Sequence, residues 1–144
     1  MDTASAIFEK DFVEDLLPQK FPFVMVDKMF SFTETTIVTG LEVKSDNIFF
    51  ADGKFQEPGL VEHMAQSVAL HTGYEFYLRK ETAPTGYIGS ISGIEIKKLP
   101  RLGDEIQSTV TILQEFGGIT MVEIQTTLNG EIVASGQMKT VLAK

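Results

Sequence analysis

The sequence contains no cysteine and only two histidines, His63 and His71. The absence of cysteine excludes disulfides, thiolate metal ligands and cysteine nucleophiles. Histidine is the side chain that ordinarily exchanges protons near neutral pH, so any imidazole base that this chain supplies must be one of these two residues. The scarcity of histidine therefore narrows the possible chemistry before any motif is considered.

Basic residues are also few: 12 Lys and Arg stand against 20 Asp and Glu, which gives a formal net charge of −8. A nucleic-acid backbone or an anionic membrane would be repelled by this charge, so we expect no nucleic-acid partner. No run of about 18 apolar residues occurs, and the first five residues lack the basic and apolar regions of a secretion signal. We expect a cytoplasmic protein without a membrane span.

The composition is that of one ordinary globular domain. The chain has 144 residues, of which 43% are hydrophobic and 22% are charged. These values suit a single core, and no repeat, low-complexity tract or linker divides the sequence. We expect one domain over residues 1–144.

The spacing of apolar residues predicts two helices and a sheet. Residues 8–17 and residues 60–80 follow a helical period, and prolines stand near their ends. Alternating or β-branched runs predict strands over residues 23–32, 35–43, 86–96, 104–115, 120–128 and 131–142, and Asn129-Gly130 predicts a hairpin turn. One long helix on an antiparallel sheet is an α+β fold, and its uncovered sheet edge predicts at least a dimer.

Three segments resemble a known family. They are Leu16-Leu17-Pro18-Gln19-Lys20-Phe21-Pro22-Phe23-Val24-Met25-Val26-Asp27, then Pro58-Gly59-Leu60-Val61-Glu62-His63-Met64-Ala65-Gln66, and finally Gly86-Tyr87-Ile88-Gly89 with Ile94-Glu95-Ile96-Lys97-Lys98-Leu99-Pro100-Arg101-Leu102-Gly103-Asp104. In this order they resemble the hotdog-fold (3R)-hydroxyacyl-acyl-carrier-protein dehydratases. The resemblance implies a hotdog fold, in which strands wrap one long helix and dimers join two sheets edge to edge.

The resemblance also implies roles for particular residues. Dehydration needs a base for the α-proton, an acid for the departing hydroxyl and donors for charge on the thioester oxygen. The acid of the family carries over onto Glu62, and the oxyanion donors carry over onto the helix-start amides of Gly59, Leu60 and Val61, with Gly89 a further candidate. Gln66 and Phe55 are expected at the substrate site. No cofactor is implied, because phosphopantetheine arrives on the carrier-bound substrate.

The loop before the long helix departs from the fatty-acid dehydratases, which carry a histidine there. Residues 49–57 read Phe-Phe-Ala-Asp-Gly-Lys-Phe-Gln-Glu, and Gln19 replaces a second histidine of the opening motif. This loop is similar instead to the dehydratase-like proteins of aryl-polyene and related pigment clusters. The base is therefore left open, with His63, Asp52 and Lys54 as candidates.

Each assignment has a plainer alternative. Adjacent helical residues diverge by about 100°, so Glu62 and His63 do not form a tight pair, and His63 then serves packing or an interface. Glu62 itself would be a first-turn residue stabilised by the helix dipole. Lys97, Lys98 and Arg101 are expected to dock an acidic acyl carrier protein, although exposed basic residues also serve solubility.

Three functions remain open from the sequence. The first is a 3-hydroxyacyl-carrier dehydratase in polyene or specialised fatty-acid synthesis. The second is a non-catalytic subunit that completes a heteromeric dehydratase, since the loop histidine is missing. The third is a hotdog thioesterase, in which Glu62 would activate water and free acid would be released.

Overall fold

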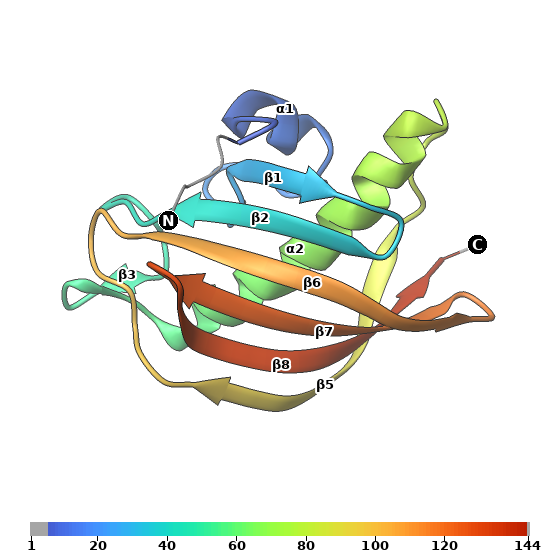
Figure 1. The fold of residues 1–144 in the computed structure, drawn as a ribbon. Helices are drawn as coiled ribbons and strands as arrows, with labels where there is room; N and C mark the ends of the chain where they lie inside the picture. The colour runs from blue at the N-terminus through green and yellow to red at the C-terminus, as the bar shows by residue number, and fades with distance from the viewer. Residues whose placement is uncertain (1–5, 144) are drawn as a thin grey trace.

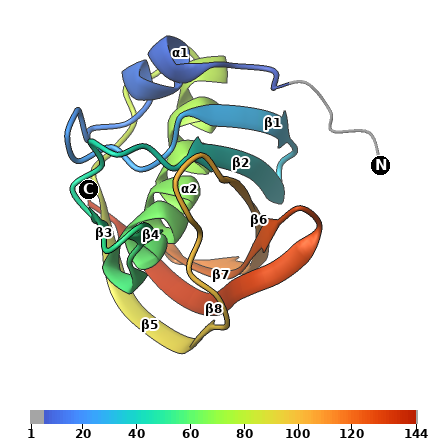
Figure 2. The same cartoon turned by 90° about the vertical axis from the view of Figure 1, so that its left-hand side faces the viewer.

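The computed structural model describes residues 6–143. The elements are α1 (Lys10–Asp15), β1 (Lys28–Phe32), β2 (Thr36–Glu42), β3 (Phe50–Ala51), β4 (Lys54–Phe55), α2 (Glu57–Leu78), β5 (Gly86–Ile96), β6 (Glu105–Phe116), β7 (Ile119–Leu128) and β8 (Glu131–Leu142). Six strands form one antiparallel sheet in the order β1-β2-β6-β7-β8-β5. The sheet curves around α2, as Figures 1 and 2 show, and the expected α+β hotdog arrangement is confirmed.

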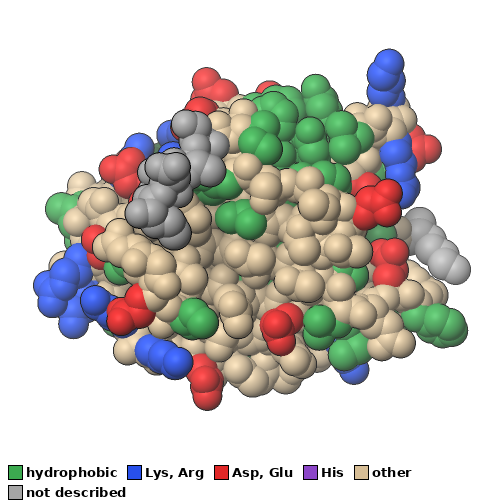
Figure 3. Space-filling model, in the orientation of Figure 1, with side chains coloured by type: hydrophobic (Ala, Val, Ile, Leu, Met, Phe, Trp, Pro, Cys, Tyr) green, Lys and Arg blue, Asp and Glu red, His purple; other side chains and the backbone are tan. Residues whose placement is uncertain are grey.

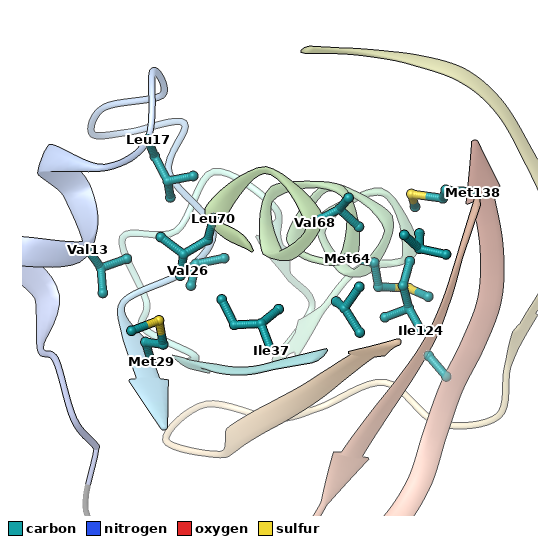
Figure 4. Close-up of a cluster of buried hydrophobic side chains, with 13 residues drawn as sticks. Val13, Leu17, Val26, Met29, Ile37, Met64, Val68, Leu70, Ile124 and Met138 are labelled. Atoms are coloured by element: carbon teal, nitrogen blue, oxygen red, sulfur yellow. The ribbon is translucent and has the colours of Figure 1, made fainter. Parts of the chain in front are cut away.

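The core fills the space between α2 and the concave side of the sheet. Its larger cluster combines residues of the first 30 positions, such as Val13 and Met29, with Met64 and Leu70 of α2 and Ile124 of β7, and all five are fully buried. Figure 4 shows these side chains between the helix and the strands. Burying one such aliphatic side chain contributes roughly 1.5–3 kcal/mol, so the helix is held to the sheet mainly by this layer.

The strand predicted over residues 23–32 forms only from Lys28 onward. The N–H groups of Phe23 and Val24 turn back to the carbonyl of Lys20. The N–H of Met25 donates to the side chain of Gln66 at 2.6 Å instead of to a neighbouring strand. Side chains of α2 thus take the place of ladder hydrogen bonds in this segment, which a pattern of apolar residues does not reveal.

Both helices differ from their predicted bounds for local reasons. α2 starts at Glu57, ahead of the predicted Leu60, because a proline at the second helical position loses no hydrogen bond there. α1 is shorter than residues 8–17, since Phe8 pairs with Met29 by two backbone hydrogen bonds of 3.1 and 3.0 Å. The turn at Asn129-Gly130 forms as predicted, between β7 and β8.

A glycine fixes where α1 meets α2. A Cβ atom on Gly73 would collide with the carbonyl oxygen of Leu16, so only glycine lets the segment after α1 lie this close to the helix. Lys20 secures the same segment, because its ammonium group donates to the carbonyls of Glu14 and Leu17. These contacts hold residues 15–19 against one side of α2.

Candidate active site

A cavity of about 440 Å³ lies between α2, the segment after α1 and the start of β5. The helix contributes Val68 and six residues spaced three or four apart, Glu62, Ala65, Gln66, Ala69, Thr72 and Gly73. This spacing places them on one side of a helix. Three of the six are alanine or glycine, and their small size leaves the room that larger side chains would fill.

Glu62 enters this cavity in a fixed orientation. Its Oε2 accepts a hydrogen bond of 2.7 Å from Nε2 of Gln66, one turn further along α2. The other hydrogen of that Nε2 goes to the carbonyl of Phe23 at 3.0 Å, and Oε1 of Gln66 accepts from the N–H of Met25. Every hydrogen-bonding group of the buried amide is thereby engaged, so Gln66 holds the carboxylate as a rigid strut.

Gln66 was expected to contact substrate, whereas the structure gives it a positioning contact to Glu62. The side chain of Gln66 is 1% exposed, and its amide is satisfied by two backbone groups and one carboxylate. The residue still lines the cavity beside Glu62. Gln66 therefore lies beside Glu62 at the cavity, with its amide bound to the Glu62 carboxylate.

His63 lies on a different side of α2, away from the cavity lining, and is fully buried. Its Nδ1 lies 2.7 Å from the carbonyl of Met25, so Nδ1 carries the hydrogen and donates. Its Nε2 then accepts from the hydroxyl of Ser108 at 2.9 Å, and Ser108 in turn accepts from Thr126 at 2.6 Å. The geometry favours the packing alternative for this histidine.

Burial lowers the pKa of His63 from its ordinary 6.5 to about 4, and the acceptor carbonyl of Met25 opposes this only in part. A charged ring would need a hydrogen on Nε2, where it would meet the hydroxyl of Ser108 that now donates. His71 is also a structural residue: its Nε2 donates to the carbonyl of Thr33, and its ring stacks on Phe32. Neither histidine faces the cavity.

The expected oxyanion donors, Gly59, Leu60 and Val61, lie within the first turns of α2. Because α2 begins at Glu57, the N–H groups of Gly59 and Leu60 already donate to the carbonyl of Gln56, at 3.0 and 3.2 Å. Val61 lies one residue further inside the helix, where its N–H belongs to the helical hydrogen-bond pattern. These three amides are engaged within the helix in this structure, and their role as oxyanion donors stays a prediction.

Phe55 is likewise a core residue, because its side chain is 0% exposed and belongs to the second core cluster. A Cβ atom on Gly59 would lie 2.5 Å from the Phe55 ring, so glycine is needed there for packing. Asp52 and Gly53 form the turn of the β3–β4 hairpin. The open loop candidates for the base thus lie outside the cavity lining.

Gly89 remains beside the cavity. It sits between Ile88 and Ser90, where the pairing of β5 with β8 shifts register, and Ile88 is part of the cavity lining. A register shift of this kind leaves the backbone of the extra residue out of the ladder. Gly89 therefore stays a candidate donor toward substrate.

Sequence reasoning gave no site role to most of the cavity wall, including its titratable residues Asp15 and Tyr87. The small residues at positions three, seven and eleven after Glu62 were a readable signal for an open helix face. Nothing in the sequence spacing places Asp15 there, because it reaches the cavity only through the close contact of Gly73 with Leu16.

The basic residues expected to dock a carrier do come together. A hollow of about 330 Å³ is lined by Lys97, Lys98 and Arg101. Lys54 of β4 and Glu57, the first residue of α2, complete its charged lining. Lys54 pairs with Arg101 through an isolated β-bridge, which joins the β3–β4 hairpin to the loop after β5. Figure 3 shows Lys and Arg side chains gathered at the left end of the molecule, the end that carries β3 in Figure 1.

Within residues 6–143, no three His, Asp or Glu side chains gather as a metal site would require. In the same part of the chain, no helix is long and apolar enough to cross a membrane. The described cavity therefore contains one carboxylate that a side-chain hydrogen bond holds in place, that of Glu62. Its other titratable groups are Asp15 and Tyr87.

A long helix wrapped by an antiparallel sheet defines a hotdog-fold protein, and its candidate site is a cavity beside the helix that contains a hydrogen-bonded carboxylate. The model of the ApeP-like family, described as ApeP dehydratase, matches residues 12–144. The chain belongs to this family, and the resemblance seen in the sequence is confirmed.

Relatives and solved structures agree with the family. The chain is 33% identical over 129 residues to the 3-hydroxyacyl-[acyl-carrier-protein] dehydratase FabZ of Polynucleobacter asymbioticus, covering 85% of each chain. It is 29% identical to FabZ of Vibrio cholerae, covering 88% of this chain and 86% of that one. The solved dehydratase heterocomplex ApeI:P of Xenorhabdus doucetiae matches with a TM-score of 0.85 at 18% identity, covering 92% of this chain and 91% of that one.

Proposed function

We propose that this protein acts in the dehydration of carrier-bound 3-hydroxyacyl thioesters to trans-2-enoyl thioesters, with Glu62 as the general acid. The observation that carries the proposal is the carboxylate of Glu62, held at the cavity by Gln66 at 2.7 Å. A general acid must stand in a defined position relative to the leaving hydroxyl, and the strut provides that position. Phosphopantetheine arrives with the substrate and needs no resident site.

The base comes, in this proposal, from a second subunit. The described cavity lining contains no histidine, and both histidines of the chain are committed elsewhere. β5 is an edge strand of the sheet and exposes Tyr87, Ile88 and Ile91, of which the first two also line the cavity. A partner that pairs with this edge would stand directly beside Glu62. The similarity to a dehydratase heterocomplex supports a heteromer over a homodimer.

Carrier docking is assigned to the hollow lined by Lys97, Lys98 and Arg101. The chain has a net charge of −8, so an acidic carrier would meet favourable charge only at such a local patch. Replacing all three residues with alanine should raise KM for the carrier-bound substrate severalfold at low salt and leave kcat unchanged. Lys139→Ala, an exposed change on β8, is the control. Equal KM values for both variants would contradict the assignment.

The function is tested by mass analysis of 3-hydroxyacyl carrier protein after incubation with this chain, alone and with a histidine-bearing dehydratase chain. We expect loss of water with the companion present and a fall of at least 100-fold for Glu62→Gln, since a general acid contributes on the order of 10²–10⁴-fold. The control Glu123→Gln makes the same change at an exposed site on β7.

Each outcome of this assay points to one function. Loss of water without the companion identifies a dehydratase that needs no second subunit. Release of the free acyl chain without an enoyl thioester identifies a thioesterase and contradicts the proposal. No reaction with either arrangement overturns it as well. If the companion reaction proceeds equally with Glu62→Gln, the chain is a non-catalytic subunit.

A further inference from the structure

Among residues 6–143, one buried side-chain oxygen or nitrogen has no hydrogen-bond partner, and it is Oε1 of Gln19. Leaving a buried acceptor unsatisfied costs about 1–3 kcal/mol, so folded proteins keep few of them. Gln19 lines the same cavity as Glu62. The one unmatched buried side-chain acceptor within residues 6–143 therefore belongs to a residue of the cavity wall.

The position of Gln19 is secured by its neighbours rather than by its own side chain. Lys20 donates to the carbonyls of Glu14 and Leu17, and Leu16 rests against Gly73 of α2. The backbone on both sides of Gln19 is thus tied to α1 and α2. A residue at this place cannot retreat from the cavity without breaking those contacts.

The amide of Gln19 differs from that of Gln66 in this respect. All of the hydrogen-bonding capacity of Gln66 is used inside the protein. Gln19 is only half-buried, and a half rotation of its terminal amide would exchange its acceptor for a donor at the same point. Oε1 itself is closed to solvent in this structure, and a turn of the half-buried side chain brings its amide, with both acceptor and donor, to the cavity.

We propose that Gln19 recognises the 3-hydroxyl group of the substrate by accepting its hydrogen, which makes it a specificity-determining residue. This rests on the proposed function. A 3-hydroxyl that accepts a proton from Glu62 still carries a hydrogen of its own, and inside a cavity that hydrogen needs an acceptor. Oε1 of Gln19, once turned toward the cavity, is such an acceptor, because it has no partner inside the described part of the protein.

The reaction balances with Gln19 unchanged. The partner's base takes the hydrogen from C2, and the electron pair of that bond forms the C2–C3 double bond. The C3–O bond breaks, and the departing oxygen takes the proton of Glu62. Water leaves with one hydrogen from Glu62 and the hydrogen that pointed at Gln19. The base ends protonated and Glu62 ends as a carboxylate.

The test compares two thioesters that differ only in the hydroxyl, a 3-hydroxyacyl and a saturated acyl pantetheine. Binding is measured in the Glu62→Gln background with the companion chain present, so that the first ligand survives. Gln19→Met keeps the length of the side chain and removes its acceptor. We expect it to weaken the 3-hydroxyacyl ligand by about tenfold, the effect of one neutral hydrogen bond, and to leave the saturated ligand unchanged.

The control is Gln114→Met, the same change at an exposed site on β6. The unfolding midpoint of Gln19→Met should be unchanged or higher, because the unmatched oxygen is gone. Equal weakening of both ligands, or of neither, overturns the assignment of Gln19. Dehydration by the protein with an intact Glu62 is followed in parallel. Its absence overturns the proposed function, whereas its presence with unchanged ligand preference overturns Gln19 alone.

Discussion

Two neighbouring residues of α2, Glu62 and His63, stand in opposite chemical situations. Glu62 faces a cavity and is held by one side chain. His63 is sealed between helix and sheet, with both ring nitrogens engaged. The hydrogen bonds of the two residues meet at the backbone of Met25. Its N–H donates to Gln66, which holds Glu62, and its carbonyl accepts from His63. A single backbone unit therefore joins a site for chemistry to a polar cluster that serves the fold.

The contrast teaches that the polar character of a helix residue says little about its role until its hydrogen bonds are counted. On the sealed side, Ser67 donates to the carbonyl of His63 and accepts from Thr39, so every hydroxyl has a partner. On the cavity side, an acceptor of Gln19 is left over. The two sides of α2 therefore differ in that a buried acceptor without a hydrogen-bond partner occurs on the cavity side, whereas the hydroxyl groups on the core side all have partners.

The largest effect should come from breaking the strut on the cavity side. Gln66→Met frees Glu62 and leaves the N–H of Met25 and the carbonyl of Phe23 without partners. We expect kcat to fall by roughly 100-fold with KM nearly unchanged, because a misplaced acid loses most of its contribution. Steady-state kinetics on folded protein checks this. A rise in KM with kcat unchanged would assign Gln66 to substrate binding instead.

Stability should fall in the same variant, by about 1–3 kcal/mol for each backbone group left unsatisfied. Urea unfolding measures this cost, and Gln114→Met serves as the matched control at an exposed position. The stability loss and the rate loss are separate readouts. A variant that loses stability but keeps its kcat would show that the strut serves only the fold.

An acid titration should sharpen the contrast on the sealed side. The pKa of His63 is about 4 in the folded protein and 6.5 in the unfolded chain, so only the unfolded chain binds the proton between those values. Stability is therefore complete above pH 6.5 and falls as the pH drops toward 4, by about 3 kcal/mol in all. His63→Gln should remove this slope in urea unfolding measured at several pH values.

The comparison with the variant also separates His63 from Asp27. Burial raises the pKa of Asp27 above 3.8, which acts in the opposite direction at the acid end of the same window. Asp27 is present in both proteins, so its contribution cancels in the difference. An unchanged slope in His63→Gln would show that the ring is not held neutral.

The smallest effect should come from Ser108→Ala. This change leaves Nε2 of His63 without its donor and costs about 1 kcal/mol of stability, while the dehydration rate of folded protein stays unchanged. Ser45→Ala, in an exposed loop, is the control. A lower rate would mean that the sealed cluster reaches Glu62 through Met25, and the two sides of α2 would then act as one unit.

Much of the fold was predictable because it rests on periodicity. The four strands after α2 and the turn at Asn129-Gly130 follow from alternation and turn chemistry. Residues 23–27 were not predictable, because their backbone groups bind side chains of Gln66 and His63 more than 35 positions away. Glu62 was found by resemblance, and the structure places it in the cavity wall, where its role as acid stays a prediction. Gly59 and Phe55 lie outside that wall, because the N–H of Gly59 donates to Gln56 and the ring of Phe55 packs in the core.

The open edge of β5 also bears on how much of the protein a cell needs. Tyr87, Ile88 and Ile91 lie exposed on one strand, and two copies of this chain have the same strand to offer each other. A second copy of this chain and the proposed partner subunit would then compete for the same edge of β5. The ratio in which this chain and the proposed second subunit are synthesised would then set how many complete sites form. Excess copies of this chain would pair with each other and form no complete site.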